Sequence, residues 1–176
     1  MPTIIPALTD TELQEVKSQG ERSVYEQCKK LSGQDLILFS LPWVRTNYVG
    51  GARDGETDFI LFNERGFIVI EVKGGGISVE RETDSWISTD RNQDTHVIKN
   101  PFKQASDYKY DVLNYLNAQN GWRDAGPRVN MGHAVIFPNL DDVTSFKHTS
   151  SPLEIIAGKE ELSNLEEYSS DLYDQL

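Results

Sequence analysis

Apolar residues recur along the chain at two different spacings, and these spacings predict where helices and strands lie. In residues 9–31 they return every three or four positions, which is the spacing of one buried helix face. This predicts a helix or a pair of helices, with Thr9 or Asp10 as the N-cap. The short apolar run at 36–41 predicts a buried strand that ends at Pro42.

The segment from Glu56 to Lys73 carries the strongest strand pattern. Residues 59–62 and 67–72 are apolar at odd and even positions alike, and residues 63–66 between them read Asn-Glu-Arg-Gly, a turn sequence. Strands that are apolar on both faces belong in the middle of a sheet that is covered on both sides. We therefore predict a central hairpin here.

The rest of the chain predicts a mixed architecture. Glycines 74–76 should break the sheet or turn the chain. The later elements are short strands at 77–79 and 86–88, a polar loop at 89–95, a helix from Asn100-Pro101 to about 120, strands at 135–137 and 153–156, and a final amphipathic helix at 159–176. The expected fold class is α/β, with a mixed central β-sheet flanked by helices on both faces. We expect one domain over 1–176, with a core at about 20–138 and a C-terminal strand and helix at 139–176.

Composition narrows the class of protein. Hydrophobic residues make up 38% and charged residues 26%, as in a soluble globular chain. The single cysteine, Cys28, excludes an internal disulfide and fits a cytoplasmic location, and no apolar stretch approaches the roughly 20 residues of a membrane helix. The net charge of −11 argues against a general nucleic-acid coat, because phosphate binding rests on Lys and Arg. It is compatible with a site in which carboxylates hold a cation.

Two acidic residues are predicted to face each other in the central hairpin. If Asn63 pairs with Gly66 across the turn, counting outward sets Asp58 opposite Glu71. Like charges at directly opposed positions are destabilising, and a divalent cation is the simplest compensation, because hard cations take carboxylate oxygens. Lys73 lies two residues beyond Glu71 and therefore shares its face.

Two acids and one amine at the end of a strand pair are the groups that metal-assisted phosphodiester hydrolysis uses. The same pattern fits two solvated acids with Lys73 as their ion-pair partner, and a one-residue slip in register would turn one acid to the other face. Glu21, beside the apolar stripe of the first helix, is a further candidate, because a carboxylate near a packed face needs a partner. The alternative is an ordinary boundary glutamate.

Residues 55–75, GETDFILFNERGFIVIEVKGG, resemble the core of the NERD (nuclease-related) domain, a family of the PD-(D/E)XK restriction-endonuclease-like superfamily. The acidic residue of the first half-motif matches Asp58, and the E-x-K half-motif matches Glu71-Val72-Lys73. Three further segments are similar to the family's first helix, a later helix and a later strand: GERSVYEQCKKL at 20–31 with Glu21, KNPFKQASDY at 99–108 with Gln104, and HAVIFP at 133–138. One departure is Thr57, which stands where a proline often precedes the acidic residue.

The resemblance implies a restriction-endonuclease-like core and a Mg²⁺- or Mn²⁺-dependent nuclease acting on DNA, in DNA processing or defence and in some cases joined to a helicase. It implies Asp58, Glu71 and the Val72 carbonyl as metal ligands, with Glu21 bound directly or through water. Lys73 would position the attacking water, and Gln104 would hold Lys73 or a phosphate.

Several residues are weaker candidates for contact with the substrate. Gln104 and Tyr108 are four positions apart, so they share one helix face, although Tyr108 also reads as a core residue. Candidates for a basic rim that follows phosphates are Arg45, Arg53, Arg91, Lys99 and Lys103, each of which also reads as ordinary surface charge. The alternatives in function are a nuclease-like module that binds nucleic acid or a partner protein without cleavage, and a carboxylate-based hydrolase of another substrate. The chain also fits a fragment of a longer multidomain protein.

Overall fold

The computed structural model describes residues 1–45, 53–80, 82–119, 122, 129–147 and 151–176. Its main sheet has six strands in the order β1-β2-β3-β4-β8-β9. Their bounds are Thr3–Ile5 for β1, Leu36–Arg45 for β2, Arg53–Asn63 for β3, Gly66–Val72 for β4, Met131–Ile136 for β8 and Ile156–Ala157 for β9. β2, β3 and β4 pair antiparallel, whereas β1 with β2, β4 with β8 and β8 with β9 pair parallel, so the sheet is mixed as predicted.

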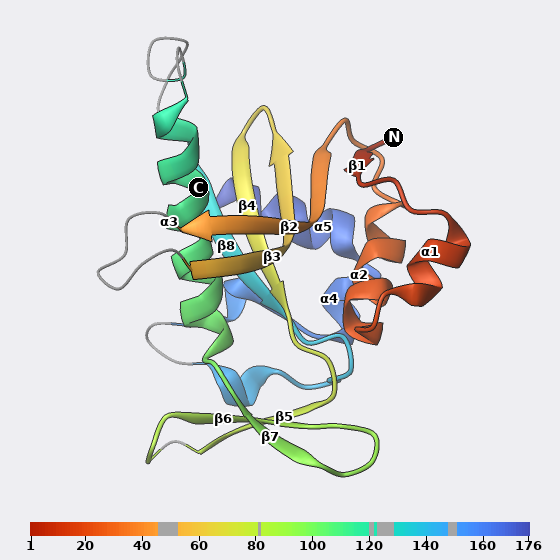
Figure 1. Ribbon diagram of the computed structural model, residues 1–176, viewed down its shortest axis with the longest axis vertical. Helices are drawn as coiled ribbons and strands as arrows, with labels where there is room; N and C mark the ends of the chain where they lie inside the picture. Colours follow the sequence, from red (N-terminus) through yellow and green to blue (C-terminus); the bar gives the residue numbers. More distant parts are fainter. Residues whose placement is uncertain (46–52, 81, 120–121, 123–128, 148–150) are drawn as a thin grey trace.

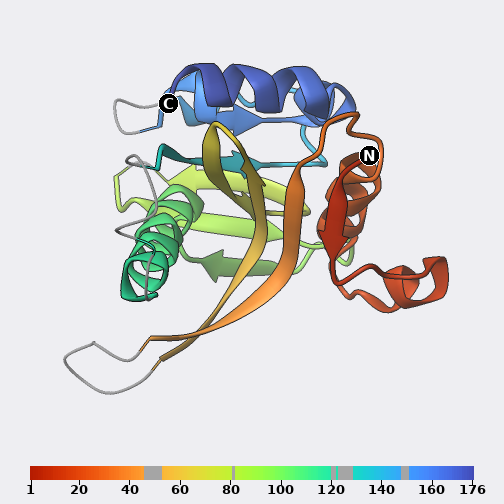
Figure 2. The ribbon, with the colours of Figure 1, turned by 90° about the horizontal axis from the view of Figure 1, so that it is seen from above.

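Helices cover both faces of this sheet (Figures 1 and 2). Their bounds are Asp10–Glu15 for α1, Gln19–Cys28 for α2, Pro101–Ala118 for α3, Lys159–Ser163 for α4 and Leu165–Asp174 for α5. Phe59 and Leu61 of β3 pack into the cluster that α2, α4 and α5 cover, whereas Ile60 packs against Tyr108 and Val112 of α3. The predicted α/β class, with helices on both faces, is confirmed.

The central hairpin has the predicted register. Asn63 pairs with Gly66 and Phe62 with Phe67, and the pairing continues outward to Phe59 with Ile70. Both strands are buried through their middle, with β2 on one side and β8 on the other. A short turn and two apolar faces together leave little freedom for a slip, because a shift of one residue would reverse every side chain.

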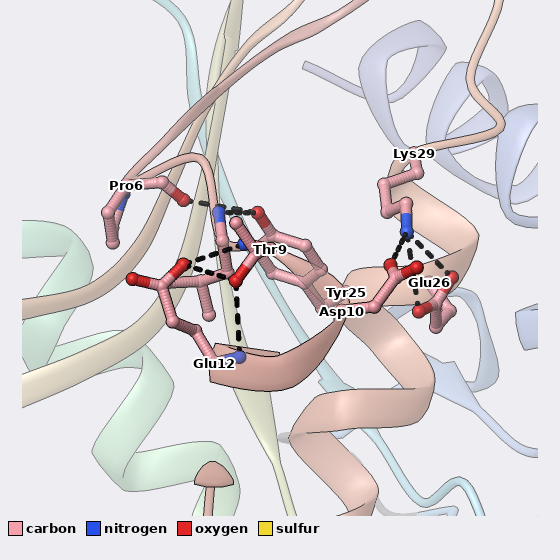
Figure 3. Close-up of polar contacts among 8 residues, drawn as sticks. Pro6, Thr9, Asp10, Glu12, Tyr25, Glu26 and Lys29 are labelled. Atoms are coloured by element: carbon pink, nitrogen blue, oxygen red, sulfur yellow. Dashed lines mark hydrogen bonds and ion pairs between the residues drawn. The ribbon is translucent and has the colours of Figure 1, made fainter. Parts of the chain in front are cut away.

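Polar contacts fix the N-terminal segment to α2 (Figure 3). The Thr9 hydroxyl accepts the N–H of Glu12 at 3.3 Å, and the Glu12 carboxylate accepts the N–H of Thr9 at 2.8 Å, which makes Thr9 the N-cap of α1. The Tyr25 hydroxyl of α2 accepts the N–H of Leu8 at 2.8 Å and donates to the Pro6 carbonyl at 3.1 Å. The first predicted helix is therefore a pair, with the start of the chain tied to the second member.

A second sheet of three antiparallel strands extends beyond the end of β4 (Figure 1). It consists of β5 (Gly76–Glu80), β6 (Ser85–Thr89) and β7 (Thr95–Ile98). The chain enters it through Gly75, whose φ is +85° and where an added Cβ would lie 2.6 Å from the Thr89 carbonyl oxygen. Trp86 packs its ring against Phe102 and Phe146, with centroids 5.6 and 5.5 Å away, which fastens this sheet to the start of α3.

Strand β2 is longer than the sequence predicts. It continues through Pro42 to Arg45 instead of ending at the proline. β1 pairs with β2 only at residues 36–38, so Pro42 lies on an edge of the sheet, where a residue without an N–H is tolerated. The short strands β1 and β7 were not predicted, because three or four residues carry too little periodicity to be recognised.

The C-terminal segment also differs from the prediction. A strand was expected at 153–156, but Leu153–Ile155 form a 3-10 turn, and only the two residues of β9 pair with β8. The expected helix at 159–176 is two helices, α4 and α5, which meet at Asn164 with φ −114° and ψ 42°. Asparagine favours helix ends because its side chain competes for backbone hydrogen bonds. Another 3-10 turn lies at Thr144–Phe146.

No helix in the described part of the chain combines the length and the apolar character that a membrane span requires.

The cap of α3 offers a test of the fold. Asn100 accepts the N–H groups of Phe102 and Lys103 at 3.0 and 3.1 Å, so Asn100→Ala should lower the free energy of unfolding by about 1 kcal/mol. Urea denaturation measures this loss. The exposed Asn114 in the middle of the same helix provides the control, because Asn114→Ala should leave stability unchanged or slightly higher. Equal effects of both substitutions would contradict the assigned cap.

Candidate functional site

The predicted acidic pair lies where β3 and β4 stop pairing through their backbones. The last backbone pair is Phe59 with Ile70, and one further step along the same register sets Asp58 opposite Glu71. Residues alternate across a strand, so both side chains lie on the face that α3 covers, together with Ile60. The two acids therefore converge, as the sequence predicts.

Beyond the last backbone pair, the Asp58 carboxylate takes the place of a β3 carbonyl as the hydrogen-bond acceptor for Val72 of β4. Its Oδ2 accepts the N–H of Val72 at 2.8 Å. The N–H and C=O of one strand residue point to the same side, so the Val72 carbonyl also faces toward Asp58. The N–H of Lys73 instead donates to the Ile136 carbonyl of β8 at 3.0 Å, which fixes the strand end between its two neighbours.

Glu71 is the most deeply buried charged group of the site. Its side chain has 0% exposure, and one oxygen, Oε1, accepts a hydrogen bond and ion pair from the Lys73 ammonium. The other oxygen, Oε2, is buried and has no hydrogen-bond partner among the described residues. A buried carboxylate oxygen without a donor is costly, so this atom marks a place where a positive group would be stabilising.

The electrostatics of the cluster follow from its burial. Burial raises the pKa of Asp58 well above its ordinary range, and the negative charge of Glu71 raises it further, while the Val72 N–H and Lys73 oppose the shift. Burial likewise raises the pKa of Glu71 against the effect of Lys73. Burial alone would lower the pKa of Lys73, but the charges of Glu71 and Asp58 outweigh it and raise the pKa, so this amine is a cation at neutral pH.

Glu21 is brought to the same cluster by a close contact between α2 and the end of β4. A Cβ added to Gly20 would lie 3.2 Å from Val72 Cγ1 and 3.3 Å from Gly74 Cα, so the helix meets the strand through a residue without a side chain. Burial raises the pKa of Glu21, opposed by a hydrogen bond from Ser18, and the charge of Lys73 also acts on it.

The described residues do not contain three or more acidic, His or Cys side chains already gathered into a metal cluster. Two carboxylates and one backbone carbonyl are the donors that converge, with Glu21 at the border of the site. This is a smaller ligand set than a protein cage for Ca²⁺ but suits Mg²⁺, which keeps several of its waters.

Gln104 and Tyr108 lie on α3 facing the cluster. The Gln104 amide donates to the Tyr108 hydroxyl at 3.5 Å, and Tyr108 is close enough to Lys73 to help raise the pKa of that amine. Tyr108 is also 8% exposed and packs with Val112 in the core beneath α3. The structure is therefore compatible with both interpretations of Tyr108, as a core residue and as a residue beside the site.

The predicted basic rim is only partly at the site. Lys99 is exposed, and its charge acts on Glu71. Lys103 instead pairs with Asp107 of its own helix at 3.4 Å and is exposed to solvent. The side chains of Arg45 and Arg53 lie outside the described part of the structure. Arg91 lines a separate cavity beyond the end of β4.

Two residues that shape the site were missed by the sequence analysis. Ser18 caps α2 by accepting the N–H of Glu21 at 3.2 Å. The spacing from Ser18 to Glu21 has the S-x-x-E form of a helix start, so a sequence signal existed. Asn139 accepts the N–H of Gly75 at 2.9 Å and steadies the turn after Lys73, and no local pattern links residues 64 positions apart.

The chain was compared with protein families, curated proteins and solved structures. A family model described as the nuclease-related domain matches residues 17–138. No curated protein matched the chain. A solved structure, the crystal structure of protein VC1899 from Vibrio cholerae, is similar with a TM-score of 0.42 and 13% sequence identity, covering 88% of this chain and 33% of that chain. The present chain thus spans about one third of that protein's length.

The raised pKa of Asp58 predicts how stability depends on pH without metal. Between the pKa of an unfolded aspartate, about 3.9, and the raised folded value, the folded chain binds more protons, so stability falls as pH rises. Asp58→Asn removes the charge and retains an acceptor for the Val72 N–H. In chelator we expect this variant to be roughly 1–3 kcal/mol more stable than wild type at about pH 7, with the difference shrinking toward about pH 4.

Urea unfolding over a pH series in chelator measures this effect. Asp171→Asn, an exposed aspartate of α5, is the control and should follow the wild-type curve. A difference between Asp58→Asn and wild type that does not change with pH would show that Asp58 carries no buried charge.

Proposed function

The chain belongs to the nuclease-related domain family, and on that premise we propose that it is a divalent-cation-dependent nuclease that hydrolyses phosphodiester bonds of DNA. The observation that carries this proposal is the buried Glu71 Oε2, which has no hydrogen-bond partner among the described residues and belongs to a carboxylate whose charge acts on Asp58. A nuclease-related fold with a carboxylate pair that a single lysine compensates only in part is suited to a cation.

The residues present fit such an ion. Asp58 and Glu71 carry two negative charges into a buried site where Lys73 supplies one positive charge, so a divalent cation would offset the remainder. Asp58, Glu71 and the Val72 carbonyl would hold Mg²⁺ or Mn²⁺, with Glu21 bound directly or through water. A bound ion of this kind supplies an activated water and offsets charge on the phosphoryl oxygens.

The chain's own groups would act around that centre. Lys73 is held as a cation by Glu71, so it serves as a donor that orients the attacking water and stabilises developing negative charge, and it does not serve as a base. Gln104 and Tyr108 lie on α3, where Gln104 would hold Lys73 through its amide oxygen or a phosphate oxygen through its amide N–H. Lys99 extends positive charge outward from Glu71. Coupling to a helicase stays a prediction of the family resemblance, and location in the cytoplasm stays a prediction from the single cysteine.

Cleavage of plasmid or single-stranded DNA in the presence of Mg²⁺ or Mn²⁺ tests the proposal. We expect chelator to abolish the reaction, Asp58→Ala to remove it, and Lys73→Ala to lower the rate about 100-fold or more, because each change removes charge stabilisation from the reacting phosphate. The matched controls are Lys30→Ala, at an exposed position just past the C-terminal end of α2, and Asp171→Asn, at an exposed position of α5. Both variants should cleave at the wild-type rate.

Three results would contradict the proposal. Equal cleavage by wild type, Asp58→Ala and Lys73→Ala would point to a contaminating enzyme. Hydrolysis that chelator does not affect would favour a carboxylate-based hydrolase. DNA binding without any cleavage would favour the alternative of a nuclease-like module that recognises nucleic acid without cutting it.

A further inference from the structure

A cavity of about 610 Å³ lies beyond the end of β4, next to the acidic cluster but lined by other residues. Four glycines line it together with polar and basic side chains. The lining includes Gly20 and glycines 74–76, with Lys17, Arg22, Arg91, Asp90 and Asn139 around them. Gly74 follows Lys73 directly and Gly20 precedes Glu21, so the cavity and the cluster share the same segments of main chain.

The charge of this lining differs from that of the rest of the molecule. Lys17, Arg22 and Arg91 have no acidic partner within ion-pair distance in the part of the chain that the structure describes, although the whole chain carries a net charge of −11. Arg22 is held in place because its guanidinium donates to the carbonyl and side chain of Gln14 at 3.2 and 3.3 Å. Three cations around one cavity repel each other unless an anion joins them.

Asp90, the acidic residue of the lining, forms no ion pair with these cations, and the lining keeps a net positive charge. Asp90 uses its Oδ1 to accept the N–H groups of Asn92 and Asp94 at 2.8 and 3.0 Å, within its own turn, and its Oδ2 lies 3.8 Å from His96. The nearest groups to its carboxylate are therefore those of the β6–β7 turn.

Two other cavities of similar size have mostly acidic charged residues in their lining, so the basic lining is a property of this cavity and not of cavities in this protein generally. One, of about 540 Å³ at the hairpin turn, is lined by Asp35, Glu64 and Glu166 with Arg65. The other, of about 600 Å³, is lined by Glu166, Glu167 and Asp171 with Lys30. Basic residues thus gather at the cavity that adjoins the acidic cluster.

We infer that this cavity binds a phosphate of the nucleic-acid strand adjacent to the one positioned at Asp58, Glu71 and Lys73. A strand that places one phosphodiester at the cluster continues past the end of β4, along the cavity that glycines 74–76 line. Lys17, just before α2, and Arg91, just after β6, both line the cavity and contact the phosphate, and the contact is independent of base sequence. The inference rests on the proposed function, because the phosphate in the cavity belongs to the same DNA strand that the acidic cluster would cleave.

The test is the binding of a fluorescent single-stranded DNA oligonucleotide in chelator, measured by anisotropy over a range of salt concentrations. Lys17→Ala combined with Arg91→Ala should weaken binding roughly fivefold to tenfold at about 50 mM salt and reduce the slope of log Kd against log salt by about 0.7 for each phosphate that is no longer neutralised. Both residues are exposed, so thermal melting should show an unchanged fold. The matched control, Lys29→Ala with Lys30→Ala, removes the same charge at the other end of α2 and should bind like wild type.

Equal binding by the two double variants would overturn the inference, as would an absence of DNA binding by the wild type. Displacement of the oligonucleotide by inorganic phosphate at constant ionic strength would identify a site for free phosphate and also overturn it. Because no cleavage occurs in chelator, the two proposals fail separately. A wild type that binds through these residues but never cleaves contradicts the nuclease, and one that cleaves without using them contradicts only the phosphate site.

Discussion

Two carboxylates of like charge, opposed on neighbouring strands and shielded from water, are the constraint around which this protein is organised. Asp58 and Glu71 face each other where the central hairpin opens, with Lys73 as their cationic neighbour. Burial raises the pKa of both acids, so the arrangement is unfavourable for an isolated chain at neutral pH. This electrostatic cost is the reason for our proposal that the site binds a cation.

The fold holds this arrangement through rigid parts on every side. The hairpin is buried between β2 and β8, and its outer end is held by the Val72 N–H on Asp58 and the Lys73 N–H on β8. α3 closes one face with Gln104 and Tyr108, while Gly20 lets α2 approach closely enough to bring Glu21 to the border. Since neither strand can slip without reversing its apolar side chains, the two acids stay opposed.

Features set by local chemistry could be predicted from the sequence. The short turn between Asn63 and Gly66 fixes the register, and Asn100 and Thr9 mark helix starts. Features set by distant partners could not. The route of β2 through Pro42 depends on how far β1 extends, the break at Asn164 depends on how two helices pack, and Lys103 turns to Asp107 instead of the site. The basic cavity is lined by residues from four separate segments, so no local sequence pattern predicts it.

The binding of a divalent cation by the acidic pair is tested most directly by thermal melting with Mn²⁺ or Mg²⁺. At about 100 times the dissociation constant, a cation bound only by the folded chain adds about 2.7 kcal/mol, which for a domain of this size raises Tm by roughly 5–10 °C. The predicted result is a rise of this kind in wild type that Asp58→Asn abolishes and Asp171→Asn retains. An equal rise in wild type and Asp58→Asn, or none in wild type, would contradict a metal centre at Asp58 and Glu71.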